Sequence, residues 1–418
     1  MNTVWICISM IAIIALIAIS IYLMNVKEGF ESASFKSDKE YVKQVKLLSD
    51  TYSDASNGKR PLDETLVNIP ESEQIFTNFY SLGCRATGYI GPIGDTYYDP
   101  DIAVQNAVLA GCRTFVLEID YIQDCDASQY FPTLVVRDKQ GKLMIHPASN
   151  KPMCNSNAYS TIRDICEKIN YYAFAPSCQN ATDPVVLVLY FLRQPPGGYD
   201  STTVLTYFSN VAKMIQPLAT HFLKNEPTGT YYRQKQEGQI LMNHINAYKN
   251  KVLLFSNANT SGFRGKQYPA MDDLDFLVNL RLSYTQTQLG ITDNTSGSTF
   301  GILETAENFM IIPTDRTENI VNDTKLKWTI CLSKDPDVSV KKEVYETITQ
   351  KFGVHCVPII MYDIPNNQYI FSDKLFKKHS YIPKPKELRF VRPPVIVPAE
   401  PSKKMDANQG FLREPTIM

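Results

Sequence analysis

The sequence predicts an α/β domain built around a parallel sheet. Helical segments alternate with short apolar strands from about Glu71 to Lys384. Strands that are apolar along their whole length are typical of a sheet covered by helices on both faces. Two arrangements fit this alternation, a doubly wound sheet and a (β/α)8 barrel. A barrel needs about 250 residues, and this region supplies about 310.

The composition of the 418-residue chain indicates a large globular core. Hydrophobic residues make up 44% of the chain, and the formal net charge is −1. Without a basic excess to neutralise phosphates, nucleic acid is not an expected partner. Neither GxGxxG nor GxxxxGK[ST] occurs, so the sequence predicts no loop that cradles a nucleotide.

The N-terminus carries an apolar run, Val4 to Met24, without a charged residue. It is long enough to cross a bilayer as a helix. No Lys or Arg precedes it and no small-residue cleavage site closely follows, which favours a retained anchor over a cleaved signal peptide. Five lysines follow between positions 27 and 46, which by the positive-inside rule keeps the domain cytosolic. We therefore expect a single-pass membrane protein with an anchor over 1–26.

The segment over 27–70 is polar and is expected to be a stalk or linker. Within it, Asp38 to Ala55 has a narrow apolar stripe that fits either a stalk helix or a packing helix. Further helices are predicted by apolar residues at helical spacing, and strands by short β-branched runs. The predicted helices are Ile102–Ala110, Tyr159–Phe174 and Thr203–Leu223, and the predicted strands are Leu109–Ile122, Pro184–Leu192, Lys251–Asn257 and Cys356–Asp363.

The strand "LAGCRTFVLEIDYI" ends with two acids, Glu118 and Asp120. Residues two apart in a strand point to the same side, so the two carboxylates are expected to lie together. In a barrel, acids at the carboxyl ends of strands lie at the mouth, where such enzymes place their chemistry. Two interpretations remain open: a site near a metal or phosphate, and structural ion pairs with neighbouring Lys or Arg.

Nine cysteines occur, and six of them fall between Cys84 and Cys178. No CxxC is present, so zinc ribbons and thioredoxin-like chemistry have no support. Buried free thiols and disulfides both fit the remaining pattern. Residues 390–418 are Pro-rich with little periodicity, which predicts an extended or disordered tail that could serve as a ligand for a protein partner.

Several motifs together resemble the phosphoinositide-specific phospholipase C family. "GCRTFVLEIDYI" resembles the family strand that begins GCR and carries two acidic calcium ligands, and "YIPKPKELR" resembles the "GYVLKPxxLR" that closes the second, or Y, half of the catalytic barrel. Between them, "DPVVLVLYFL", "KNKVLLFSN" and "FGVHCVPIIMYDIPNNQYIF" resemble further family strands in the family's order. The resemblance covers about Phe76 to Arg389 and implies a (β/α)8 barrel over 71–389, the X and Y halves together.

The resemblance implies a phosphoric diester hydrolase of lipid metabolism. Members split a phosphoinositide into diacylglycerol and a phosphorylated inositol, with one histidine as base, a second as acid, and calcium on carboxylates. On this sequence it implies Glu118 and Asp120 as metal ligands and His146 as the catalytic histidine. Arg113 and Lys251 are the expected substrate-binding residues. Calcium is the implied cofactor, and a phosphoinositide or another phosphodiester lipid is the implied ligand.

This sequence departs from the family pattern at most catalytic positions. The base histidine of the "SHNTY" motif has no counterpart, because residues 79–92 contain no histidine. The third acidic ligand falls on Tyr190, the phosphate-binding lysines on Phe255 and Asn257, and an arginine on Met310. We therefore expect a membrane-anchored phospholipase C-like protein with reduced or lost catalysis. The alternative is a non-catalytic barrel, a pseudoenzyme that serves as a membrane-associated binding or structural module suited to a virion or organelle membrane.

Overall fold

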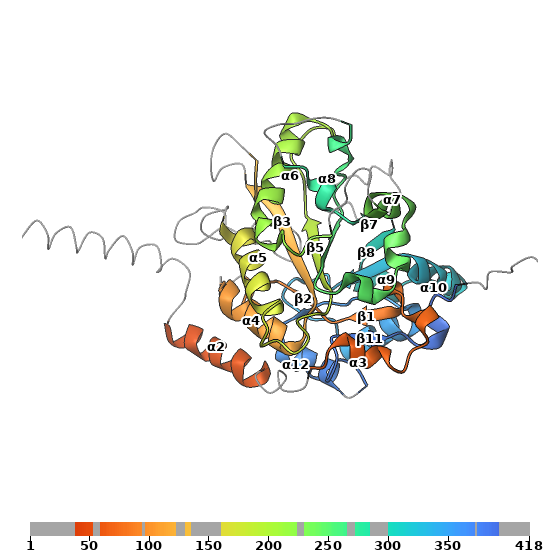
Figure 1. The fold of residues 1–418 in the computed structure, drawn as a ribbon. Coiled ribbons are helices and arrows are strands. Elements are labelled where there is room, and N and C mark those ends of the chain that lie inside the picture. The colour runs from red at the N-terminus through yellow and green to blue at the C-terminus, as the bar shows by residue number, and fades with distance from the viewer. Residues whose placement is uncertain are drawn as a thin grey trace, which may run out of the picture.

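The chain forms an eight-stranded parallel barrel surrounded by helices (Figure 1). The structure is a computed structural model, and it describes residues 38–52, 59–93, 97–122, 130–134, 160–223, 230–265, 272–284, 300–372 and 374–392. The barrel strands follow one another around the sheet in chain order. They are β2 (Gly83–Arg85), β3 (Thr114–Ile122), β5 (Val185–Phe191), β6 (Val252–Ser256), β7 (Leu280–Tyr284), β8 (Gly301–Thr305), β9 (Trp328–Leu332) and β10 (Ile359–Ile360).

The last strand, β10, closes the barrel because it and the residues leading into it lie between β2 and β9. β10 pairs with β2 in parallel, with Ile359 opposite Cys84. Just before β10, Cys356 bridges Ile330 of β9 in parallel, and the N–H of Cys331 donates to the Cys356 carbonyl at 2.9 Å. Because β10 and the residues leading into it have a neighbour on each side, the barrel arrangement is confirmed and the doubly wound sheet is not formed.

The apolar strands are buried on both faces, as their composition predicts. Val116 and Val188 point into the barrel, where they pack with Phe255 and Trp328 in one cluster. The alternating positions, such as Leu187, point outward and pack against the helices in a second cluster. Since strand side chains alternate between faces, a continuous apolar run supplies both clusters at once.

The helices cover the outside of the barrel. The helix before β3 begins where Asp99 accepts hydrogen bonds from the N–H groups of Asp101 and Ile102, and it ends at Gly111, whose φ is 96°. The side-chain cap and the left-handed glycine fix where this helix starts and stops. The helices are α4 (Pro100–Ala110), α5 (Ser160–Ala173), α6 (Thr202–Met214), α7 (Thr230–Glu237), α8 (Leu274–Leu277), α9 (Ala306–Met310), α10 (Thr317–Leu326), α11 (Lys342–Glu346) and α12 (Ile364–Asn367).

A two-stranded ribbon closes the amino end of the barrel. β1 (Phe79–Ser81) pairs antiparallel with β11 (Tyr381–Pro383), and α3 (Leu62–Leu66) lies next to this ribbon (Figure 1). Tyr381 packs into the interior cluster, and its hydroxyl donates at 2.9 Å to the carbonyl of Pro184, the residue before β5. We call this closed amino end the floor. The outer strand β4 (Phe131–Thr133) extends β3 at the opposite end.

The N-terminal helix α2 (Asp38–Tyr52) packs on the barrel beside α4 (Figure 1). Leu48 and Tyr52 are buried, and the Tyr52 hydroxyl donates to the carbonyl of Met361 at 2.8 Å. Of the two alternatives for this segment, the packing helix is the one observed. The expected anchor over 1–26 and the tail beyond residue 392 lie outside the described residues. The helices that the structure does describe are all too short or too polar to cross a membrane.

The six cysteines that the structure describes are free thiols, and five of them are buried. Burial raises the pKa of the Cys166 thiol, which keeps it neutral and unreactive at ordinary pH. For these six residues the free-thiol alternative is therefore the observed one, and five of the six thiols are buried. Cys7, Cys125 and Cys154 lie outside the described residues.

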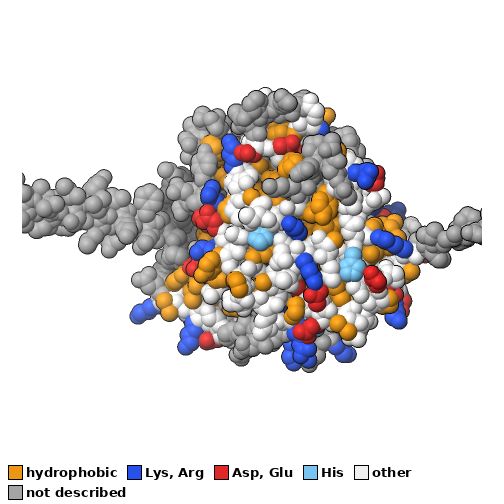
Figure 2. Space-filling model, viewed as in Figure 1, with side chains coloured by type: hydrophobic (Ala, Val, Ile, Leu, Met, Phe, Trp, Pro, Cys, Tyr) orange, Lys and Arg blue, Asp and Glu red, His pale blue; other side chains and the backbone are white. Residues whose placement is uncertain are grey.

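Acidic and basic side chains are interspersed on the surface. Figure 2 shows them next to one another over the visible face, mixed with apolar groups. This mixing fits a chain with 42 basic and 43 acidic residues. Partner recognition on this surface must therefore depend on local arrangements of charge rather than on the net charge of the chain.

Candidate functional site

Polar side chains gather where the barrel strands end, at the end we call the mouth. β2 ends at Arg85, and β3 carries Glu118 and Asp120 near its carboxyl end. Tyr190 of β5 stands directly opposite Glu118 in the sheet register. Because parallel strands all end on the same side of a barrel, these groups form one site.

Glu118 is held by a bidentate ion pair with Arg85. Arg85 Nε donates to Glu118 Oε1 at 2.5 Å, and a terminal nitrogen donates to Oε2 at 3.1 Å. Burial alone would lower the pKa of the Arg85 guanidinium, but the charge and hydrogen bonds of Glu118 outweigh burial and raise that pKa. Arg85 also donates to the carbonyl of Ser333, the residue after β9. The guanidinium is therefore a fixed, permanently charged part of the mouth.

Asp120 is held by a different arginine. Arg193, two residues after β5, donates from Nε to Asp120 Oδ1 at 2.6 Å and from a terminal nitrogen to the Tyr121 carbonyl at 2.7 Å. Its guanidinium also stacks over the Tyr121 ring, 4.1 Å from the centroid. Asp120 itself has no exposed surface. This second pair is therefore anchored by charge, a carbonyl and an aromatic face together.

The two acids are thus paired in opposite directions around the barrel. β3 lies between β2 and β5 in the sheet, so Arg85 reaches Glu118 from one side and Arg193 reaches Asp120 from the other. Calcium usually takes six to eight oxygen ligands. The part of the chain that the structure describes contains no cluster of three or more His, Cys, Asp or Glu side chains able to hold a metal. The described residues of the mouth therefore do not fit a calcium ion.

The described histidines lie away from the mouth. His221 is held by the Asn250 carbonyl just before β6, and His244 caps a short turn before the same strand. His355 is buried before β10, where its ring contacts Thr77 at 3.0 Å. The fourth, His379, contacts Thr65 at 2.9 Å beside the floor. The predicted catalytic residue His146 lies outside the described residues.

The two predicted substrate-binding cations lie at the floor. Arg113 immediately precedes β3, has no exposed surface, and donates to the carbonyls of Ala173 at 2.8 Å and Asn180 at 2.6 Å. Lys251 immediately precedes β6, and its carbonyl accepts from the N–H of Val185. Both therefore stand at the amino ends of strands, one strand length away from the acids. The structure does not bring them together with Glu118 and Asp120.

Two arginines of the mouth were missed by the sequence reasoning. Arg85 ends the strand that the family motifs align with the missing base histidine, and Arg193 follows the apolar run of β5. A search for cations at the carboxyl ends of strands would have found both, because that end is where a barrel gathers its functional side chains.

Comparisons with known proteins find likeness in structure but not in sequence. No protein-family model matches the sequence, and no curated protein is similar to it at a significant level. Among solved structures, the chain is similar to a calcium-dependent phosphoinositol-specific phospholipase C from Pseudomonas sp. The identity is 13% and the TM-score 0.40, with 75% of this chain and 96% of that chain covered.

Two further solved structures show the same kind of likeness. L. pealei PLC21 has 13% identity and a TM-score of 0.46, covering 77% of this chain and 39% of that one. A calcium-dependent phosphatidylinositol-specific phospholipase C from Streptomyces antibioticus has 10% identity and a TM-score of 0.42. The match covers 74% of this chain and 99% of that chain. These three likenesses are of structure, at low identity and with TM-scores below 0.5. What the mouth does must be argued from its own residues.

Proposed function

We propose that this chain is a membrane-anchored phospholipase C-like barrel that binds a phosphoinositide or another phosphodiester lipid, with calcium-dependent hydrolysis reduced or lost. The proposal places the barrel on the cytosolic side of the membrane. One observation carries it: the Arg85 guanidinium is bonded to both carboxylate oxygens of Glu118. A protein cation therefore already neutralises the carboxylate that the family pattern assigns to calcium.

Arginines suit binding better than proton transfer. A guanidinium presents several N–H donors and matches the oxygens of a phosphate, but it does not give up its proton. Arg85 and Arg193 can therefore attract and orient a phosphodiester without acting as base or acid. General acid–base catalysis supplies about 10²–10⁴ in rate, and the described residues place no histidine at the mouth to supply it.

A second candidate function is metal-independent hydrolysis. The observation that favours it is the buried, permanently charged guanidinium of Arg85 at the mouth, since a fixed cation can stabilise the charge that develops on a transferring phosphoryl group. This reaction would also need a proton acceptor close to the substrate hydroxyl. Because the two acids that β3 places there, Glu118 and Asp120, are both ion-paired, binding without turnover ranks first.

The deciding experiment measures turnover and binding with the full-length protein in detergent. Release of soluble inositol phosphate from phosphatidylinositol micelles is followed with calcium and with chelator, beside a Glu118→Gln/Asp120→Asn control. Binding to vesicles with and without phosphoinositide is measured in parallel. We expect binding to the phosphoinositide vesicles and no turnover above the control.

Three other results would change the proposal. Calcium-dependent turnover that the double substitution abolishes would restore the family's reaction and overturn the loss of catalysis. Chelator-insensitive turnover that Arg85→Met abolishes would establish the second candidate. Equal binding to both kinds of vesicle, without turnover, would remove the lipid ligand and leave a structural module.

A further inference from the structure

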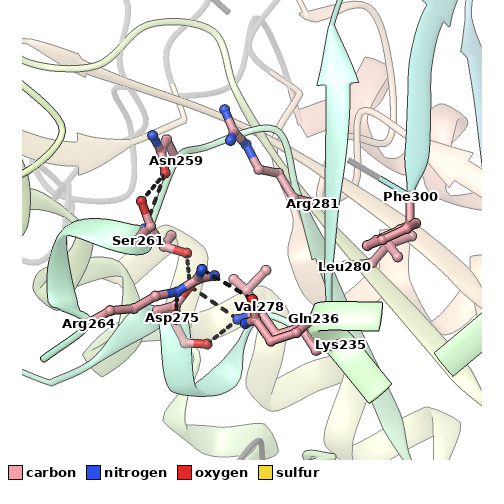
Figure 3. A pocket seen from close by; sticks show the side chains of 11 residues that line it. Lys235, Gln236, Asn259, Ser261, Arg264, Asp275, Val278, Leu280, Arg281 and Phe300 are labelled. Atoms are coloured by element: carbon pink, nitrogen blue, oxygen red, sulfur yellow. Dashed lines mark hydrogen bonds and ion pairs between the residues drawn. The ribbon is translucent and has the colours of Figure 1, made fainter. Parts of the chain in front are cut away.

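A small pocket lies beside the mouth, where β6 ends and β7 begins. Its volume is about 50 Å³. Its lining comes from α7, from the segment that follows β6, from α8 with the start of β7, and from Phe300 (Figure 3). Arg281 of β7 pairs with Ser256 of β6 in the register, while their neighbours Leu280 and Phe255 pack inside the barrel. Arg281 therefore points out of the barrel. We call this site the rim pocket.

The rim pocket has an excess of positive charge. Its lining includes three cations, Lys235, Arg264 and Arg281, and one carboxylate, Asp275. Asp275 accepts from Arg264 Nε at 2.9 Å, from Lys235 Nζ at 3.1 Å and from the Thr260 hydroxyl at 2.7 Å. A single carboxylate thus holds two cations in place, and Lys235 and Arg264 together exceed its charge by one.

The carboxylate keeps its charge under ordinary conditions. Burial alone would raise the pKa of Asp275, but the charges of Lys235 and Arg264 and their hydrogen bonds lower it to about 2. Lys235 and Asp275 are both almost fully buried. Asp275 therefore holds the Lys235 and Arg264 side chains in place inside the pocket. A bound anion then loses less free energy in ordering these two side chains.

A buried amide in the rim pocket has an unused donor. Asn259 is 9% exposed, and its Oδ1 accepts from the Ser261 N–H at 3.2 Å and from the Ser261 hydroxyl at 2.7 Å. Its Nδ2 is buried and meets no acceptor among the described residues. Figure 3 shows the Arg281 guanidinium directed to the side of the pocket where Asn259 and Ser261 lie. A buried donor without an acceptor destabilises a fold unless a ligand supplies one.

These features together define the ligand. The charge excess and the unused N–H donor both call for an acceptor with negative charge. The volume holds more than one water-sized group but falls far below the 300 Å³ or more of a typical small-molecule site. We propose that the rim pocket binds one phosphate group, either as free phosphate or as the terminal monoester of a larger ligand. This site is separate from the mouth and does not rest on the function proposed there.

The test follows thermal unfolding and calorimetric binding of the full-length protein with inorganic phosphate, and with chloride at matched ionic strength. We expect phosphate to raise Tm in proportion to the logarithm of its concentration. Asn259→Asp removes the donor and adds a negative charge at nearly constant shape, and Arg281→Gln removes one cation. Each is expected to weaken phosphate binding about tenfold or more, which corresponds to one lost charge-assisted hydrogen bond.

Controls separate the rim pocket from other sites. Arg163→Gln removes an exposed cation of α5 and should leave phosphate binding unchanged. If Asn259→Asp fails to fold, Arg281→Gln with Arg281→Lys decides, because the lysine keeps the charge and should retain most of the binding. No phosphate-dependent rise in Tm, or a rise equal in wild type and both pocket variants, would overturn the proposal.

Two further ligands distinguish whether the bound phosphate group belongs to a soluble molecule or to a lipid. Glycerol 3-phosphate serves as a soluble monoester, and vesicles with phosphatidylinositol 4-phosphate present the same group on a lipid. Vesicle binding that free phosphate competes away, and that Arg281→Gln weakens, assigns the lipid source. Binding of glycerol 3-phosphate without such competition assigns a soluble one. Either result upholds a phosphate site in the rim pocket.

Discussion

The two ends of the barrel hold their cations in different ways. At the mouth, Arg85 and Arg193 each pair with a carboxylate, at 2.5 and 2.6 Å. At the floor, Arg113 donates to backbone carbonyls and to the Asn180 amide oxygen. Lys384 donates to the Thr324 carbonyl at 3.0 Å. No described carboxylate forms an ion pair with either floor cation.

This difference decides whether a ligand can replace the partner of each cation. Burial lowers the pKa of Lys384 well below its ordinary value, because carbonyls offset only part of the loss of water. Carbonyls are fixed by the fold, so a ligand cannot take their place. A carboxylate partner, in contrast, can be displaced by the oxygens of a phosphate, which offer the same chemistry. The floor therefore maintains the fold, and the mouth is the end suited to an anionic ligand.

The largest effect is expected at the floor, from Arg113→Met. The substitution leaves the Ala173 and Asn180 carbonyls without their donor in a site that has no exposed surface. We expect a loss of about 3 kcal/mol in the free energy of unfolding, measured by urea titration. A loss below about 0.5 kcal/mol, the size expected of a surface change, together with weaker lipid binding, would return Arg113 to the substrate-binding role that the resemblance implies.

A smaller effect is expected at the mouth, from the Arg85–Glu118 pair. A double-mutant cycle with Arg85→Met and Glu118→Gln should give a coupling of about 2 kcal/mol, because removing one partner strands a mostly buried charge. The matched comparison is Arg163–Glu167, an exposed pair four residues apart on α5, expected to couple by about 0.3–0.5 kcal/mol. Equal couplings would mean that Arg85 does not hold Glu118 in solution, and the carboxylate would again be available to a metal.

A pH dependence of stability is also expected, and it comes from the floor. Burial, with the nearby charge of Lys384, lowers the pKa of His355 well below its ordinary value. The folded protein then keeps this imidazole neutral while the unfolded chain binds a proton, so stability falls as pH drops below about 6.5. The slope from one such group is at most about 1.4 kcal/mol per pH unit. His355→Gln should flatten that slope in unfolding curves recorded between pH 4 and 7, and an unchanged slope would contradict the assignment.

Strand periodicity predicted the parts of the fold that are buried on both faces. β3, β5 and β6 contain apolar runs, and the sequence identifies all three because the apolar residues face either the interior cluster or the helices. β7 and β8 were not predicted individually. Each is five residues long and carries a charged residue, Arg281 or Glu304, so the apolar signal is too short to stand out.

The sequence by itself determined that Glu118 and Asp120 stand together at the end of a buried strand, since that follows from a repeat of two residues. Only the tertiary structure decided which cation each acid meets. Arg85 lies 33 positions from Glu118, and Arg193 lies 73 positions from Asp120. These separations become contacts because β2 and β5 flank β3 in the closed sheet, and strand order is a property of the whole barrel rather than of any segment within it.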